Sequence, residues 1–249
     1  MAILTAGRID LGAPLSTYTI EADANRVVVD RDPISLSRNV IKFDQRSDSA
    51  DYGGHPRSEV RLPAWSPQAE VWLYWQTLLR SEDFRPDDRP HTLIFQVHQT
   101  PDGADAAEGV PPLSFLVGGK QLTIKGAYDA TATSTSGTPT TMTFGRLPIP
   151  FNEWVSFVVR AKFDWTASGL AQIWMNGKQV VNYTGPLAYN NALGCYAKMG
   201  VYCSGGVTSR LASRVAYGTG FTVGDSSSSY SEVTGGLSAS GWRSAILMP

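Results

Sequence analysis

The sequence predicts an all-β protein built as an antiparallel sandwich or barrel, and three observations support this fold class. Short segments of alternating or β-branched apolar residues recur along the whole chain, residues typical of turns separate them, and almost no segment shows the apolar period of a helix. A chain of 249 residues, of which 42% are hydrophobic, is long enough to bury a large core. We therefore expect one large domain.

About a dozen segments have the length and composition of strands. They cover residues 18–22, 26–29, 39–43, 70–78, 92–98, 113–117, 121–125, 154–163, 171–175, 178–183, 196–202 and 214–223. Asn176-Gly177, between two of these segments, is a strong signal for a tight hairpin. A helical turn is expected only over residues 76–85, where Pro86 would end it. The Thr-, Ser- and Gly-rich residues 129–143 are expected to form a long loop.

The two ends of the chain lead to an expectation about assembly. We expect residues 1–236 to form the domain and residues 237–249 to form a C-terminal extension with an apolar end. The first ten residues lack the pattern of a secretory signal peptide, and no apolar run reaches the roughly 18 residues of a membrane span. Such a chain has either lost its signal peptide or leaves its cell by another route, such as lysis or assembly into a particle. We therefore expect an extracellular or virion-associated protein without membrane insertion. We also expect its termini to mediate assembly into a homo-oligomer or a particle.

Charge and cysteine content exclude several classes of partner. The 21 Lys and Arg residues against 22 Asp and Glu residues give a net charge of -1, so no global field attracts nucleic acid or an anionic membrane. The cations are 15 Arg and 6 Lys, and the planar guanidinium of Arg suits carboxylates. Cys195 and Cys203 alone cannot build a disulfide framework or a four-ligand zinc site. No cofactor or metal is expected, and a structural calcium ion stays an open alternative.

Three strand-like segments carry polar residues at alternate positions, so each segment directs a polar row to one face of its sheet. The rows are Arg57, Glu59 and Arg61; Gln96 and His98; and Tyr196, Lys198, Gly200 and Tyr202. Taken singly, each row has an ordinary structural interpretation. The first is typical of a salt-bridged sheet surface, the second of a hydrogen-bonded structural histidine, and the third of Tyr and Lys side chains that cover a solvated sheet face. Side by side on one concave sheet, they would place a base, a phenol, an amide and several cations in one groove.

Such a set suits removal of the C5 proton of a uronic acid, where the sugar carboxylate opposes the developing negative charge. Arg57 and Gln96 could bind that carboxylate and stabilise the charge in the transition state. A neutral His98 could accept the proton. Tyr202 could protonate the departing glycosidic oxygen, or act as the base if its phenol is ionised. Which of the two takes the proton depends on the stereochemistry at C5. Hydrolysis is less well supported, because it normally needs two carboxylates and only Glu59 is a candidate.

These segments resemble the signature strands of jelly-roll polysaccharide lyases of the alginate lyase type. The resemblance rests on Arg57-Ser58-Glu59-Val60-Arg61, Gln96-Val97-His98 and Tyr196-Ala197-Lys198-Met199-Gly200-Val201-Tyr202, in that order along the chain. Residues 154–160, 169–178 and 183–186 are similar to the corresponding stretch of glucuronan lyases and heparin lyase I relatives, and residues 221–225 with Tyr230 resemble the closing strand. The similarity spans roughly residues 40–235.

The resemblance implies a concanavalin-like β-jelly roll of two antiparallel sheets, with a concave groove that binds an acidic polysaccharide and cleaves it by β-elimination. It implies carboxylate neutralisation by Arg57 and Gln96, with His98 as base and Tyr202 as acid, or as acid and base together. The substrate-binding residues that it implies are Arg61, Glu59, Lys198 and Tyr196. One departure concerns residues 203–204, Cys-Ser, where alginate lyases usually continue to a Gln.

Two functions follow as hypotheses. The first is a lyase for a uronic-acid polysaccharide, such as glucuronan, alginate or a capsular polymer, in the manner of a phage depolymerase. The near-neutral charge disfavours heavily sulfated chains. The alternative is a non-catalytic carbohydrate-binding or virion structural or decoration protein on the same fold.

Overall fold

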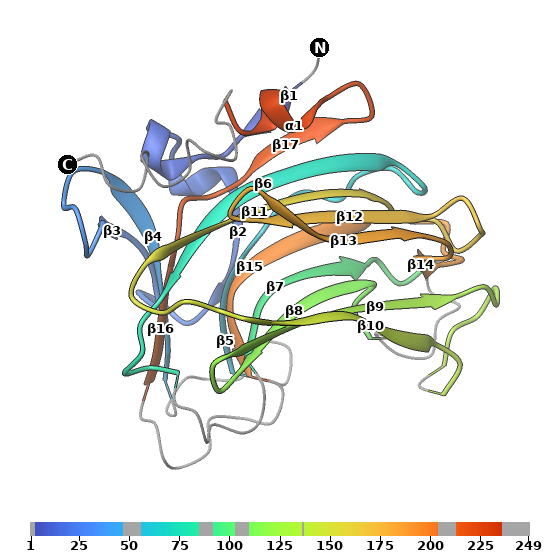
Figure 1. Cartoon of the computed structure of the whole chain (residues 1–249), viewed down its shortest axis with the longest axis horizontal. Coiled ribbons are helices and arrows are strands. Elements are labelled where there is room, and N and C mark those ends of the chain that lie inside the picture. Colours follow the sequence, from blue (N-terminus) through green and yellow to red (C-terminus); the bar gives the residue numbers. More distant parts are fainter. Residues whose placement is uncertain are drawn as a thin grey trace.

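The computed structural model describes residues 3–46, 56–84, 92–102, 110–135, 137–203 and 213–235 of the chain. In these ranges two β-sheets pack face to face around one core (Figure 1). The strand pairings are antiparallel, except that β14 runs parallel to β9. The fold confirms the predicted all-β jelly-roll sandwich.

The nine-stranded sheet has the main order β13-β12-β11-β6-β16-β4-β3, with β17 and β1 attached beside β6. Its strands are β13 (Lys178–Thr184), β12 (Leu170–Met175), β11 (Trp154–Lys162), β6 (Glu70–Leu79), β16 (Ser213–Gly218), β4 (Asn39–Arg46), β3 (Val27–Arg31), β17 (Thr222–Asp225) and β1 (Ile3–Ala6). Three short helices, η1 (Ile9–Leu11), η2 (Leu15–Thr17) and α1 (Tyr230–Val233), complete the described elements.

The eight-stranded sheet has the order β10-β9-β8-β7-β15-β5-β2, with β14 beside β9. Its strands are β10 (Thr140–Pro148), β9 (Gln121–Asp129), β8 (Leu113–Gly118), β7 (Thr92–Gln99), β15 (Cys195–Cys203), β5 (Arg57–Arg61), β2 (Thr19–Ala22) and β14 (Ala188–Tyr189). Strands β5 and β15, far apart in the sequence, are neighbours in space, because β15 lies between β7 and β5.

Aromatic side chains fill the space between the sheets. Trp75 of β6 is fully buried and stacks on Phe95 of β7 with ring centroids 4.2 Å apart. The ring centroids of Phe115, Phe157 and Phe221 lie 5.3–5.7 Å from that of the same indole. Burying one side chain of this size contributes about 1.5–3 kcal/mol to folding. The cluster therefore fixes β6 and β7 against each other and holds the backbone of β7 in place.

Strict alternation places the polar rows on the far side of the eight-stranded sheet. Phe95 and Val97 of β7 and Met199 of β15 belong to the core, so Gln96 and Lys198 point away from it. We call this outward surface the site face. Most of the expected strand residues lie in strands within the described ranges, and the Asn176-Gly177 hairpin joins β12 to β13 as predicted.

Three local predictions were wrong. The expected strand 214–223 is divided into β16 and β17, because residues 219–221 belong to neither strand. Residues 76–79 continue β6 and form no helical turn, because they pair with β11 on one side and β16 on the other. Residues 140–143 belong to β10 and not to a loop, because their Thr-rich backbone pairs with β9. Pro86 and residues 236–249, including the expected C-terminal extension, lie outside the described residues.

No helix in the described ranges has the length and apolar character needed to cross a membrane.

Candidate active site

Sheet register brings the three polar segments together. On β15, Lys198 lies opposite Arg61 of β5 and opposite Gln96 of β7, while Tyr196 lies opposite His98 of β7. Residues that face each other across adjacent strands share a sheet face. The side chains expected to cooperate therefore stand on one surface, although three separate parts of the chain supply them.

A bulge at Gly200 sets the position of Tyr202. The pairing of β15 with β7 shifts between Met199 and Tyr202, and Gly200 has a φ of 147°. A Cβ at position 200 would lie 2.2 Å from the carbonyl oxygen of Ser58, so only glycine fits there. Beyond the bulge, Tyr202 lies opposite Arg57, whose guanidinium carbon is 4.5 Å from the centre of the phenol ring. The cation–π contact holds the phenol beside a guanidinium.

Glu21 also belongs to the site, although the sequence pattern did not predict it. This buried carboxylate on β2 accepts a hydrogen bond from Lys198 Nζ at 2.6 Å. Its oxygens also lie 3.4 Å from Arg57 Nη1 and 3.5 Å from Arg61 Nε. Alternation in the expected strand 18–22 indicated that Glu21 would share a face with Thr19. Nothing in the sequence indicated that β2 pairs with β5.

Glu59 is the second carboxylate of the site, and it lies directly opposite Glu21. It is 1% exposed, and its Oε1 accepts a hydrogen bond from Gln96 Nε2 at 2.7 Å. Arg57 Nη1 lies 3.6 Å from its Oε2. Burial raises the pKa of Glu59, and the charges of Lys198 and Arg57 and the Gln96 hydrogen bond oppose this only in part. Glu59 thus contacts both Arg57 and Gln96, whereas the carboxylate beside Arg61 is that of Glu21.

A backbone carbonyl fixes the tautomer of His98. Its Nδ1 lies 2.9 Å from the carbonyl oxygen of Gln99. A carbonyl oxygen only accepts hydrogen bonds, so Nδ1 carries the proton of the neutral ring and Nε2 keeps its lone pair. The imidazole stacks on Tyr196 with ring centroids 5.7 Å apart. The buried ring can therefore accept a proton at Nε2.

A cleft of about 400 Å³ opens at the Tyr196 end of the site face. Its lining residues are Thr19, Arg61, Leu62, Pro63, Ala64, Thr100, Pro101 and Tyr196. The guanidinium carbon of Arg61 lies 5.0 Å from the centre of the Tyr196 ring, so a cation and an aromatic face border this space. A volume of this size lies within the range of ligand sites in proteins.

The eight predicted site residues occupy one face, in two contact groups. Tyr202, Arg57, Glu59 and Gln96 form one series of contacts. Arg61, Lys198 and His98 surround Tyr196 in the other. Glu21 joins the two groups through its three cations. Between them, the row of β15 has no side chain at Gly200.

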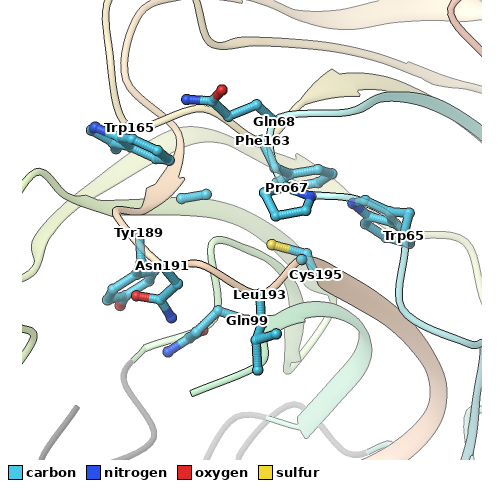
Figure 2. Close-up of a pocket in the computed structure, with 12 residues that line it drawn as sticks. Trp65, Pro67, Gln68, Gln99, Phe163, Trp165, Tyr189, Asn191, Leu193 and Cys195 are labelled. Carbon is cyan, nitrogen blue, oxygen red and sulfur yellow. The ribbon is translucent and has the colours of Figure 1, made fainter. Parts of the chain in front are cut away.

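A second pocket lies behind the site face (Figure 2). Gln99 and Cys195, which line it, adjoin His98 and Tyr196 in the chain but point to the opposite side of the sheet. Figure 2 shows Trp65 and Trp165 on two sides of this pocket. Its volume of about 10 Å³ holds about one water molecule and no sugar ring. It is therefore no substrate site.

No cluster of three or more His, Cys, Asp or Glu side chains suited to a metal ion is found within the described ranges.

Comparisons with known proteins agree with this architecture. The family model described as polysaccharide lyase matches residues 13–220. The structure of the endo-β-1,4-glucuronan lyase from the fungus Trichoderma reesei has a TM-score of 0.73 at 16% identity, covering 88% of this chain and 94% of that chain. No curated protein sequence matches this chain.

Two alginate lyases are also similar in structure. Family 7 alginate lyase A1-II', in complex with substrate, has a TM-score of 0.62 at 14% identity, covering 91% of this chain and 100% of that chain. Alginate lyase PA1167 from Pseudomonas aeruginosa has a TM-score of 0.56 at 17% identity, covering 85% of this chain and 99% of that chain. At these identities the structural likeness establishes the fold.

Proposed function

The chain belongs to the polysaccharide lyase family, and from this premise we propose that it cleaves a uronic-acid polysaccharide by β-elimination on the site face. The observation that carries the proposal is the combination of a cation and amide pair, Arg57 and Gln96, with an imidazole whose Nε2 accepts protons, on one surface. The names of its structural relatives, a glucuronan lyase and alginate lyases, support a substrate with a carboxylate on the sugar ring.

The sugar carboxylate is bound by Arg57 and Gln96. The Gln96 amide donates one of its two protons to Glu59, so the second proton is available to a ligand. Glu59 holds both groups in place, through its ion pair with Arg57 and the hydrogen bond that it accepts from Gln96. When the C5 proton leaves, negative charge moves onto the carboxylate, where the guanidinium and the amide stabilise it.

Two further groups move protons. His98 Nε2 takes the proton from C5, the electron pair of that bond forms the C4–C5 double bond, and the C4–O4 bond breaks. The Tyr202 hydroxyl donates its proton to the departing O4. Arg57 then lies beside the phenolate and stabilises its charge. The products are one fragment with a new reducing end and one fragment with an unsaturated sugar at its non-reducing end. Transfer of the proton from His98 back to the Tyr202 phenolate, through solvent, restores both groups.

Local charge favours a substrate without sulfate groups. The site holds three cations, Arg57, Arg61 and Lys198, and two carboxylates, Glu21 and Glu59. The carboxylates neutralise two of the three positive charges, and the one that is left matches the single carboxylate of the reacting sugar. Glucuronan and alginate are therefore better candidates than heavily sulfated chains.

The test is incubation with glucuronan, alginate and uronate-containing capsular polymers, followed by the ultraviolet absorbance of unsaturated sugar ends. We expect a signal with at least one polymer. His98→Ala and Tyr202→Phe should each lower the rate by about 10²–10⁴, the usual contribution of a placed acid or base. Tyr230→Phe, on α1 away from the site face, is the matched control and should keep full activity. A folded protein inert on every uronate polymer, or a fully active double variant, would contradict the proposal.

The phage-type origin and the extracellular or virion-associated location stay predictions.

A further inference from the structure

A continuous row of polar residues crosses the eight-stranded sheet, with one residue from each strand of its main path. In order from β2 to β10 the row consists of Thr19, Arg61, Lys198, Gln96, Ser114, Lys125 and Thr143. Each member lies directly opposite the next in the sheet register. The row therefore continues from the candidate active site onto β8, β9 and β10, which the proposed reaction does not use.

The far half of the row lies on the site face. Phe115 and Ile124, the neighbours of Ser114 and Lys125 in the chain, belong to the core, so Ser114 and Lys125 point away from it. The adjacent row differs, because Tyr202 is followed across the sheet by Leu93 and then Leu116. Polarity thus follows one line across the sheet and is not a general property of this surface.

Lys125 differs from the cations of the active site in its pairing. Lys198, Arg57 and Arg61 all contact Glu21. Lys125 is half-buried, and no ion pair to it is found within the described part of the chain. Its ammonium group is therefore available to a ligand carboxylate. Ser114, 3% exposed, and the exposed Thr143 flank it with hydroxyl groups that can bind sugar hydroxyls.

We propose that this row is the path of the bound polysaccharide and that Lys125, with Ser114 and Thr143, forms a distal subsite for a second uronate. The inference rests on the proposed function for the class of ligand. Gln96 and Lys125 are two strand spacings apart, about 10 Å, which corresponds to about two pyranose units. The subsite binds the carboxylate of a sugar about two units from the reacting one. At its other end the row enters the cleft lined by Thr19, Arg61 and Tyr196.

The experiment compares Lys125→Ala with Lys120→Ala, an exposed lysine in the turn between β8 and β9. Binding of uronate oligosaccharides of increasing length is measured by calorimetry in a His98→Ala background, which slows turnover by the factor given above. We expect affinity to rise with length up to the oligomer that reaches Lys125. Lys125→Ala should lower the ratio of long-oligomer to short-oligomer affinity by about five- to tenfold, whereas Lys125→Arg and Lys120→Ala should leave that ratio unchanged.

Two results would overturn the inference. One is an unchanged length dependence in Lys125→Ala, and the other is an equal loss for short and long oligomers. The ratio of kcat/KM for long and short oligomers in the His98-containing protein provides a second readout of the same effect. Binding that depends on Lys125 without turnover by that protein would reject the lyase chemistry and keep the subsite. Turnover by that protein, with a length dependence that Lys125→Ala leaves unaltered, would keep the lyase chemistry and reject the subsite.

Discussion

The amide of Gln96 owes its orientation to a single acceptor, Glu59 Oε1. A glutamine at position 59 keeps an acceptor oxygen but loses the charge, while an alanine removes both. We expect Glu59→Gln to lower kcat/KM by about tenfold, as one charge-assisted hydrogen bond becomes a neutral one, and Glu59→Ala to lower it by about a hundredfold or more. Steady-state kinetics, with circular dichroism to verify folding, measure both. Equal losses in the two variants would show that Glu59 does not act through Gln96.

Glu21 controls the charge that the site presents. Its carboxylate contacts Lys198, Arg57 and Arg61, and Glu21→Gln removes the negative charge that these three cations share. We expect the variant to be less stable and to bind polyanions more tightly, including sulfated chains, because unpaired cations attract them. Salt elution from an immobilised sulfated polysaccharide measures this.

The matched control for that experiment is Glu70→Gln. Glu70 pairs with Arg160 on the nine-stranded sheet, outside the site face. The two variants change the net charge equally, so equal salt elution would show that total charge, and not the cation cluster, governs binding.

At the scale of single elements, the β15 bulge carries a prediction about stability. Gly200→Ala places a Cβ within 2.2 Å of a backbone oxygen in β5 at a φ unfavourable to L residues. We expect a loss of about 2–4 kcal/mol in the free energy of unfolding, together with loss of activity as Tyr202 shifts. Denaturant unfolding monitored by tryptophan fluorescence measures the stability change.

Gly137→Ala is the control for this bulge variant. A Cβ at Gly137 meets nothing within 4 Å, so its effect should stay within about 0.5 kcal/mol. A Gly200→Ala protein as stable and active as Gly137→Ala would show that the bulge is not needed.

The elements also show what sequence reasoning reaches and what it does not. The alternation of Gln96 and His98 with core residues is local, so it predicted their shared face correctly. Residues 76–79 were misread because β16, distant in the sequence, imposes extended backbone on them. Residues 140–143 were misread because their Thr-rich composition resembles that of a loop, although they pair with the preceding strand β9. Glu21 could not be assigned because the pairing of β2 with β5 is a tertiary property.

At the scale of the whole molecule, one carboxyl makes stability depend on pH near neutrality. Burial, aided by the charge of Glu82, raises the pKa of Asp83 to about 6. The folded state thus binds this proton more tightly than the unfolded state, whose pKa is about 3.9. The stabilisation is fully present below pH 4 and is lost as the pH rises through about 6. As the pH rises from 4 to 7.5, the free energy of unfolding of Asp83→Asn should therefore rise by about 1 kcal/mol relative to that of the native chain, after a discount for partial exposure. Thermal unfolding across this range measures the gain.

Glu82→Gln tests the sign of this linkage. Hydrogen bonding and the nearby Arg80 lower the pKa of Glu82. Its contribution to stability is present above the unfolded pKa and lost on acidification, the reverse of Asp83. If the stability change of Asp83→Asn varied with pH in the same direction as that of Glu82→Gln, the raised pKa assigned to Asp83 would be wrong.

The hairpin between β8 and β9 has a consequence for how such an enzyme can diversify. Only Gly119 and Lys120 separate the two strands, and their pairing closes at Gly118 and Gln121. Inserting or deleting one residue in β9 would exchange the faces of Ile124 and Lys125, putting an ammonium in the core and an isoleucine in the groove. Changes of ligand preference along this half of the sheet must therefore arise by exchanging side chains at fixed chain length, or by length changes in steps of two.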